Sequence, residues 1–340
     1  MQALVYTAPN QLILEERPTP KPAAGEALIR IHYAGICGTD MAIVHGAHPR
    51  ARPPLIPGHE FAGEIVEINT GDSRTDLRVG QRVALFPLLW CGKCRACRAG
   101  DPHVCRTLRL IGIDRDGGFA EYAAIPLDHL VGLPADCDYR RGALLEPLAV
   151  GVHAVEMAGA APSDFTVVLG AGPIGIMTCQ ALRQAGCDNF ILSDINPLRL
   201  ARARAMHLPT LPLDQLEEHV VQASDGEGAD LVLECAGAPP AIMQTTTLLR
   251  PRGKAVIVSV HKQHPPVDLR SLNFKEITMI GARVYTRANF DSACAALADL
   301  DADRVISHNL PLAEGARALT LCEDRSADTC KVLLNMEECS

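Results

Sequence analysis

Residues 166–194 constrain the fold of this 340-residue chain most strongly, because they contain every part of one strand–helix–strand unit. The β-branched run "TVVL" leads into Gly170, Gly172 and Gly175 in G-x-G-x-x-G spacing. An apolar helical pattern follows and ends at Gly186, and a second strand, "FILSD", closes on Asp194. A glycine motif alone is a weak signal, but strand, glycines, helix, strand and terminal acid in this order predict a dinucleotide-binding unit.

The spacing of the three glycines gives each a separate role. Gly170 permits the tight turn, Gly172 lets the backbone approach a pyrophosphate, and Gly175 lets the helix pack closely on the strand. The helix begins at Pro173 and Ile174, so its N-terminus would face the negative charge of the phosphates. These five residues are the predicted phosphate-binding turn.

Asp194 predicts which nicotinamide cofactor is used. Its carboxylate would accept hydrogen bonds from the adenosine ribose hydroxyls and repel a 2′-phosphate, which favours NAD over NADP. Arg199 lies five residues further, inside a helix predicted to start at Asn196 and Pro197, and could partly compensate a phosphate. The alternative is that Asp194 is a strand-end acid facing solvent.

The two halves of the chain have different patterns. Apolar strands at "DLVLECAG", "AVIVSV" and "ITMIGA" alternate with helical stretches, which predicts a doubly wound parallel sheet over residues 152–288. In the first half, short alternating runs such as "ALIRIHYAG" and "QRVALFP" are broken by Gly and Pro clusters. That half is predicted to be β-rich and partly barrel-like, so the fold class is α/β.

Bulk composition excludes several functions. A net charge of −8 with scattered basic residues, and only 4% aromatic residues, argues against binding to nucleic acid. We find no secretory signal and no run of about 18 apolar residues for a membrane helix, so the expected location is cytoplasmic. Thiols stay reduced in that compartment, where clustered cysteines usually bind metal.

Four cysteines lie in one short segment, Cys91, Cys94, Cys97 and Cys105. Tetrahedral zinc needs four such ligands, and short C-x2-C pairs supply them. A thioredoxin-like motif would explain only one pair. A bacterial ferredoxin run is a competitor, but its fourth cysteine follows after three residues with Pro behind it, whereas seven residues intervene in this chain and Arg106 follows. The lobe 91–105 is predicted to hold a structural zinc, closed to substrate.

Three further fragments carry candidate metal ligands: "GICGTD" with Cys37, "PGHEFAG" with His59 and Glu60, and "LLEPLAVGVHA" with Glu146. Taken singly, they could be a buried thiol, a core histidine with its neighbour, and a carboxylate at a helix N-terminus. Spacing cannot link residues more than a hundred positions apart. The residues alone therefore do not decide whether these three fragments form a second metal site.

These fragments, the four-cysteine lobe, "GGFAEY" and "VLGAGPIG" occur in the same order in zinc-dependent medium-chain alcohol dehydrogenases. The chain most resembles their polyol and sugar-acid branch, which includes sorbitol, L-idonate, L-galactonate and galactitol-phosphate dehydrogenases. The resemblance implies a GroES-like catalytic domain over residues 1–151 and 289–340, and a Rossmann domain over 152–288. It also implies two zinc ions per subunit, NAD, and a homodimer or homotetramer.

The resemblance further implies roles for individual residues. Cys37 and His59 would be ligands of a catalytic zinc, with Glu60 or Glu146 as the carboxylate ligand. Thr39 would hydrogen-bond the reacting hydroxyl while hydride passes from a secondary alcohol to the nicotinamide. The expected substrate is a polyol or sugar acid. L-threonine, a simple secondary alcohol, or a non-catalytic zinc- and nucleotide-binding role are the alternatives.

One position departs from the family pattern. Many relatives carry a histidine five positions after the first zinc cysteine, where it passes the proton to solvent, and this chain has Ala42. His45 and His48 are nearby substitutes, and the proton route stays open. A basic residue near the substrate would favour a carboxylate or phosphate, and the candidates are Arg50, Arg52, Arg115 and Arg283.

Overall fold

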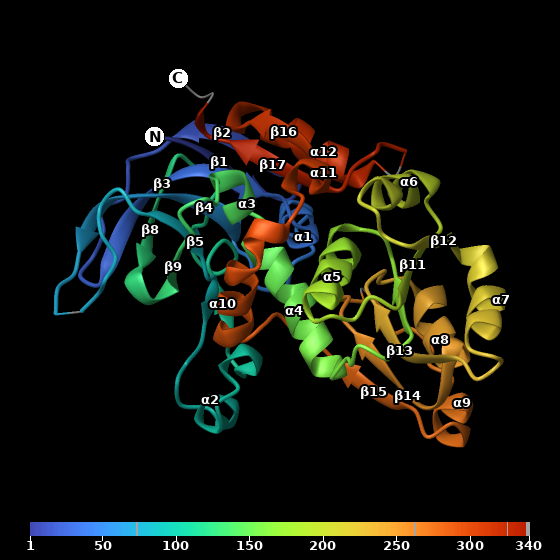
Figure 1. Ribbon diagram of the computed structural model, residues 1–340. Coiled ribbons are helices and arrows are strands. Elements are labelled where there is room, and N and C mark those ends of the chain that lie inside the picture. The colour runs from blue at the N-terminus through green and yellow to red at the C-terminus, as the bar shows by residue number, and fades with distance from the viewer. Residues whose placement is uncertain (73, 262, 325, 338–340) are drawn as a thin grey trace. The chain divides into compact units, whose positions relative to one another are not determined.

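The computed structural model describes residues 1–72, 74–261, 263–324 and 326–337, which form two compact units (Figure 1). The discontinuous unit contains Met1–Glu146 and the chain from Thr286 onward, and the continuous unit contains Pro147–Tyr285. Within the described ranges, no helix has both the length and the apolar character needed to cross a membrane.

The continuous unit is built on a six-stranded sheet in which every pairing is parallel, with the order β12-β11-β10-β13-β14-β15. Its strands are β10 (Thr166–Leu169), β11 (Phe190–Asp194), β12 (Thr210–Pro212), β13 (Ala229–Glu234), β14 (Leu249–Ile257) and β15 (Thr278–Gly281). Strands β10, β11 and β12 follow one another from the centre of the sheet to one edge, and strands β13, β14 and β15 follow one another from the centre to the other edge. The predicted doubly wound Rossmann sheet is confirmed.

Helices cover both faces of this sheet. They are α5 (Pro173–Gln184), α6 (Pro197–Ala205), α7 (Leu213–Ala223), α8 (Pro239–Leu248) and α9 (Leu269–Phe274). Right-handed crossovers put α5 and α6 on one face and the later helices on the other, and Figure 1 shows α7 and α8 across the sheet from α5. Asn196 caps α6 by accepting from the backbone N–H of Leu198, as its sequence position predicts.

The discontinuous unit has a mixed sheet in the order β16-β17-β3-β4-β5-β9, with β8 also paired to β3. The strands are β3 (Glu26–Gly35), β4 (Glu60–Asn69), β5 (Arg82–Leu85), β8 (Tyr122–Pro126), β9 (Leu130–Gly132), β16 (Ile306–Pro311) and β17 (Lys331–Asn335). A hairpin of β1 (Gln2–Ala8) and β2 (Gln11–Glu16) packs with them around one apolar core. The β-rich first half is confirmed as well.

The helices of this unit include α1 (Gly38–Val44), α3 (Tyr139–Gly142), α10 (Arg287–Ala295), α11 (Ala302–Val305) and α12 (Gly315–Glu323). Helix α4 (Leu145–Ala158) begins in this unit. The first two residues of α4 belong to the discontinuous unit and the rest to the continuous one.

The C-terminal segment completes the sheet at the place where the metal-ligand candidates gather. Strand β17 pairs antiparallel with β3, and β3 pairs antiparallel with β4, so that Leu333 and Glu60 both lie opposite Gly35. The start of β17, the end of β3 and the start of β4 therefore meet at one end of the sheet. A residue near position 331 is thereby brought beside residues near positions 35 and 60.

A separate lobe projects between two short antiparallel strands, β6 (Leu88–Leu89) and β7 (Arg109–Leu110). It contains one short helix, α2 (Arg95–Ala99). Between positions 90 and 107, all of them described, only Cys105 is buried. A segment with so little buried apolar surface needs another source of stability.

Candidate active site and metal centres

The first group of metal-ligand candidates combines Cys37, His59 and Glu60. Cys37 is the N-cap of α1, directly after β3, and His59 and Glu60 lie where β4 begins. One donor atom from each side chain lies within 4.8 Å of the others. His59 is 4% exposed and Glu60 1% exposed, so these two side chains are shielded from bulk water, whereas Cys37 is half-buried. Sulfur, imidazole and carboxylate donors at this spacing suit zinc.

The turn before Glu60 is held by the loop that carries "GGFAEY". The backbone N–H groups of Gly117, Gly118 and Phe119 donate to the carbonyls of Ile56, Gly58 and Pro57 at 2.8–2.9 Å. Gly58 has a φ of +98°, and a Cβ there would lie 2.5 Å from the ring of Phe119. The motif at 117–122 therefore acts as the support that fixes where His59 points.

Asp40, which the sequence does not reveal as a site residue, contacts both Cys37 and His59. Its carboxylate is fully buried and accepts from the backbone N–H of Cys37 at 2.8 Å. Its Oδ1 lies 3.5 Å from His59 Nδ1, where it acts on the ring as an ion-pair partner without a hydrogen bond. A carboxylate behind a ligating histidine fixes the orientation of the ring and increases its basicity.

The negative charges around His59 favour a positive charge at this position. Burial by itself lowers the pKa of His59, but the negative groups of Asp40 and Cys37 outweigh it and raise the pKa well above its usual range. In the metal-free protein the ring is therefore the natural counter-charge of its neighbours. A divalent cation would take over that role.

Lys331 is the second functional candidate that the sequence did not reveal. Its ammonium is buried and donates to Glu60 Oε2 at 2.5 Å and to the carbonyl of Ile36 at 3.2 Å. Burial lowers the pKa of Lys331, but Glu60, Cys37 and Glu146 together raise it above its normal value, so it stays charged. The other oxygen of Glu60, Oε1, is buried and has no hydrogen-bond partner.

That unpartnered oxygen is a test of whether the residues fit a metal. A buried carboxylate oxygen without a partner costs free energy of about 1–3 kcal/mol, more when charged. Gly35 leaves room for the carboxylate, because a Cβ there would lie 2.3 Å from Glu60 Oε2. The site thus holds a sulfur, an imidazole nitrogen and a carboxylate together, and the carboxylate has one oxygen still without a partner, which fits zinc.

Two other predicted residues lie close by without joining the donor group. Thr39 is half-buried in the first turn of α1, two positions after Cys37. Glu146 is 7% exposed in the first turn of α4, and its charge acts on Lys331. Among the described residues, the clustered donors are Cys37, His59 and Glu60, without Glu146.

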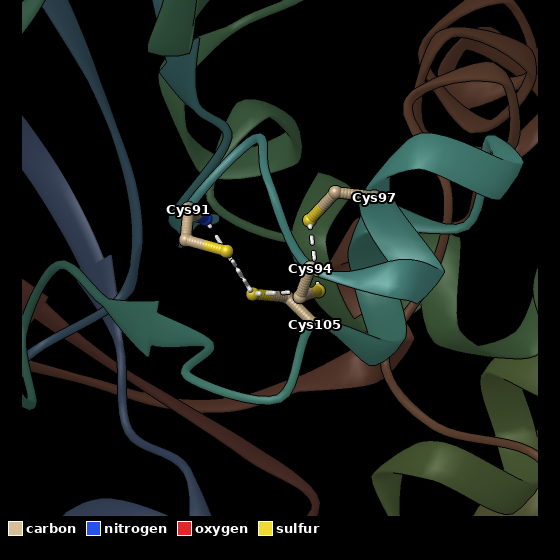
Figure 2. A group of neighbouring side chains, drawn as sticks. All are labelled: Cys91, Cys94, Cys97 and Cys105. Atoms are coloured by element: carbon tan, nitrogen blue, oxygen red, sulfur yellow. Dashed lines mark hydrogen bonds between the residues drawn. The ribbon is translucent and has the colours of Figure 1, made fainter.

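The second group is the four-cysteine lobe (Figure 2). Cys94 Sγ lies 3.4 Å from Cys97 Sγ and 3.8 Å from Cys105 Sγ, and Cys105 Sγ lies 3.5 Å from Cys91 Sγ. Four sulfurs about 2.3 Å from a tetrahedral zinc would lie about 3.8 Å apart. A disulfide needs about 2.05 Å, so these spacings fit a metal and not a bridge.

The pKa values of the thiols show how ionisation of the lobe would depend on a bound cation. Backbone N–H groups of Lys93 and Cys94 lower the pKa of Cys91 to about 6. Burial and the neighbouring thiols raise the pKa of Cys97 to about 12. All four thiols cannot ionise next to one another unless a positive ion lies between them.

The glycine-rich turn has the predicted form. Gly170 has a φ of +102°, and a Cβ on Gly175 would lie 1.7 Å from the carbonyl oxygen of Gly170. Gly172 is the N-cap of α5, with Pro173 and then Ile174 in the first turn. The nearest atom to a Cβ on Gly172 is Arg199 Nη1 at 4.0 Å, so the backbone there is open to a ligand.

Asp194 is tied to that turn. Its Oδ2 accepts from the backbone N–H of Ala171 at 2.7 Å, and its Oδ1 accepts from that of Asn196 at 2.8 Å. It is 7% exposed, and Arg199 Nη1 lies 3.7 Å from Oδ2. Asp194 is therefore held at the strand end rather than free in solvent, and Arg199 does reach it.

The candidates for the missing histidine lie after α1. The backbone N–H of His48 donates to the carbonyl of Ala42, and the ring Nδ1 of His48 accepts from the backbone N–H of Ala51 at 3.2 Å. Burial and Arg50 lower the pKa of His48, so its ring is neutral at pH 7. His45 instead pairs with Glu323 and Asn10.

The candidate substrate-binding arginines have different surroundings. Arg50 pairs with Asp114 at 3.0 Å and Arg115 with Glu26 at 3.2 Å. Arg52 donates to the carbonyl of Ala51, and Arg283 is exposed on the continuous unit. Arg50 and Arg115 already have carboxylate partners, which makes them weaker candidates for an anionic substrate.

A Rossmann sheet with a glycine-rich turn and a β-rich unit with two groups of candidate zinc ligands are the parts of a zinc-dependent dehydrogenase. Residues 23–135 match the alcohol dehydrogenase GroES-like domain, and residues 173–299 match the zinc-binding dehydrogenase domain. The chain belongs to the zinc-dependent medium-chain dehydrogenase family, and the resemblance inferred from the sequence is confirmed.

Individual relatives narrow the comparison. The 2-dehydro-3-deoxy-L-galactonate 5-dehydrogenase of Pseudoalteromonas atlantica is 37% identical over 92% of this chain and 93% of its own length. The L-galactonate-5-dehydrogenase of Escherichia coli K12 is 34% identical over 92% of each chain. The crystal structure of an alcohol dehydrogenase from Escherichia coli CFT073, complexed with NADH, has a TM-score of 0.90 and 29% identity over 99% of both chains.

Proposed function

We propose that this protein oxidises a secondary hydroxyl of a polyol or sugar acid to the ketone, with NAD as hydride acceptor, and catalyses the reverse reaction. The observation that carries the proposal is the donor group Cys37–His59–Glu60, in which a buried carboxylate completes the ligand set. Sugar-acid dehydrogenases among the relatives support this substrate class.

Three protein ligands leave one position for substrate, as catalytic zinc sites do. A zinc ion bound there would polarise the hydroxyl oxygen of the substrate and lower its pKa. Asp40 holds the ring of His59, and Lys331 holds one oxygen of Glu60, so the chain fixes both ligands before substrate arrives. Thr39, in the first turn of α1, accepts a hydrogen bond from the substrate hydroxyl.

The nucleotide site lies in the continuous unit. Gly170, Gly172 and Gly175 form the phosphate-binding turn with the N-terminus of α5, and Asp194 with Arg199 binds the adenosine ribose. NAD bound there would accept the hydride. The four cysteines of the lobe hold the second zinc for structure, because four sulfur ligands leave no open position.

NADH formation with a substrate panel tests the proposal. Purified protein with zinc and NAD is given L-galactonate, L-idonate, sorbitol, galactitol phosphate, L-threonine and 2-butanol, and NADH fluorescence is followed. The proposal expects the highest kcat/KM with a sugar acid or polyol. Turnover of only L-threonine or only 2-butanol would contradict the proposed substrate class. If no compound gave NADH, a non-catalytic role would be favoured.

The two glutamates are predicted to differ in their effects on rate. Glu60→Gln is expected to lower kcat by about a hundredfold and weaken zinc retention, because its carboxylate lies in the donor group. Glu146→Gln is expected to cost about tenfold or less and to retain zinc, because it acts through Lys331. Zinc content and steady-state rates measure both variants. Wild-type rates in Glu60→Gln, or a larger loss in Glu146→Gln, would contradict this order.

Asp194 is predicted to determine the preference for NAD. A 2′-phosphate would bring about 1.5–2 negative charges against this anchored carboxylate, and each 1.4 kcal/mol of repulsion costs about tenfold in affinity. Asp194→Ala is expected to lower kcat/KM for NAD by about tenfold or more and to raise it for NADP, since Arg199 remains. The exposed Asp188, before the same strand, gives the control Asp188→Ala. An unchanged NAD-to-NADP ratio in Asp194→Ala would reduce Asp194 to a structural acid.

A further inference from the structure

A second buried carboxylate lies at the carboxyl edge of the parallel sheet. Glu234, the last residue of β13, is fully buried. Its Oε1 accepts from the backbone N–H groups of Ala236 at 2.9 Å and Gly237 at 2.8 Å. Its Oε2 accepts from the Ser259 hydroxyl and lies 3.2 Å from His261 Nε2. One carboxylate therefore gathers four donors.

These donors come from two different loops. Ala236 and Gly237 follow β13, whereas Ser259 and His261 follow β14. The backbone carbonyl of Glu234 also accepts from the N–H of Ser259, at 3.1 Å. A buried carboxylate is costly unless its hydrogen bonds are made, so removing its charge would loosen both loops together.

The position of the two loops points to a ligand. The strand order reverses between β10 and β13, and ligands of such sheets bind outside the carboxyl ends at that point. The loop after β13 borders the phosphate-binding turn, because a Cβ on Gly170 would lie 2.9 Å from Ala236 Cα. Asp194 and Arg199 lie on the other side, after β11 and in α6.

A dinucleotide occupies both halves of a doubly wound sheet. Because the adenosine ribose is assigned to the β11 side, the nicotinamide half is expected to lie against the loops after β13 and β14. Val260, between Ser259 and His261, is 90% exposed. Both neighbours of Val260 in the chain contact Glu234. The exposed apolar side chain of Val260 is suited to packing against the face of the nicotinamide ring.

We propose that Glu234 is a positioning residue for the nicotinamide half of NAD, holding the loops after β13 and β14 in the conformation that receives it. This inference rests on the proposed function, because it assumes that the continuous unit binds NAD. Glu234 acts through Ser259, His261 and the backbone of residues 236–237. It does not take part in the hydride transfer.

Binding of AMP and NADH to Glu234→Gln tests the role, because AMP fills only the adenosine half of the site. The glutamine keeps the shape of the side chain but loses its charge and two of its acceptor functions. AMP affinity is expected to stay within about twofold of wild type, while NADH affinity falls by about tenfold or more. KM for NAD should rise more than kcat falls. His261→Ala, which removes one donor at the rim, should show the same pattern more weakly.

Asp230→Asn is the matched control, at the opposite end of the same strand. Asp230 pairs with Arg250 Nε at 2.6 Å and accepts from the N–H of Phe165 at 2.8 Å. Its loss is expected to lower stability without changing the ratio of NADH to AMP affinity. Equal weakening of AMP and NADH in Glu234→Gln and His261→Ala, or wild-type NADH affinity in both, would overturn the inference while leaving the proposed function intact. A wild-type protein that binds no NADH would overturn both.

Discussion

Replacing His59 with alanine is expected to abolish NAD-dependent turnover while NADH still binds. His59 supplies one of three clustered donors, and a metal site that loses one ligand exposes its ion to competing water. The loss in kcat/KM should be at least about a thousandfold, because polarisation of the substrate hydroxyl depends on that ion. NADH binding is measured by fluorescence, since the phosphate-binding turn lies in the other unit.

The same substitution has a structural cost. It leaves the fully buried Asp40 without the ring that faces it, which should lower the free energy of unfolding by about 1–3 kcal/mol. His219→Ala, on helix α7 of the continuous unit, is the control, because it removes an imidazole away from any clustered donors. Turnover retained by zinc-depleted His59→Ala would eliminate the metal mechanism.

Replacing Cys94 with serine is expected to remove about half of the bound zinc and to destabilise the lobe. Cys94 Sγ lies 3.4 Å from the sulfur of Cys97 and 3.8 Å from that of Cys105, and a hydroxyl is a poor ligand for zinc. Only Cys105 is buried between positions 90 and 107, so within this described segment the metal replaces a hydrophobic core. The melting temperature should fall by several degrees.

Metal analysis and thermal unfolding test this prediction together. Cys187→Ser is the control, since Cys187 is a buried thiol of the continuous unit outside both donor groups. Its zinc content should equal that of the wild type. Full zinc content and unchanged melting in Cys94→Ser would refute the structural role of the lobe.

The parts of the fold that the sequence predicts well are local. The unit from β10 to β11 is readable because its strand, glycines, helix and terminal Asp194 lie within thirty positions, and each has its own steric reason. Asn196 is readable as a helix cap for the same reason. The cysteine lobe is equally compact, with ligands that follow one another along fifteen positions of chain.

The candidate catalytic site is not local, and its supporting residues escape a reading of the sequence. Lys331 lies 271 positions from its partner Glu60, and only the pairing of β17 with β3 brings the two together. Asp40 did carry a local signal, because it stands three positions after Cys37 at the start of a helix, where it meets the Cys37 backbone N–H.

The choice between Glu60 and Glu146 was open for a physical reason. Both are carboxylates next to apolar runs, and spacing gives no distance between β4 and α4. The packing separates them, because among the described residues a carboxylate oxygen of Glu60 lies in the donor group with Cys37 and His59, whereas Glu146 is outside that group. Its role as ligand remains a prediction that the two glutamine variants test.

Zinc titration of the metal-free protein tests the central claim most directly. Bound zinc and NADH formation are followed together as zinc is returned, with the best substrate of the panel present. Because the described residues hold two donor groups, we predict two zinc ions per chain, with turnover appearing only as the group of Cys37, His59 and Glu60 fills. In Cys94→Ser, turnover should accompany the single zinc that remains. Full NADH formation without zinc, or with zinc bound only by the four cysteines, would contradict the account.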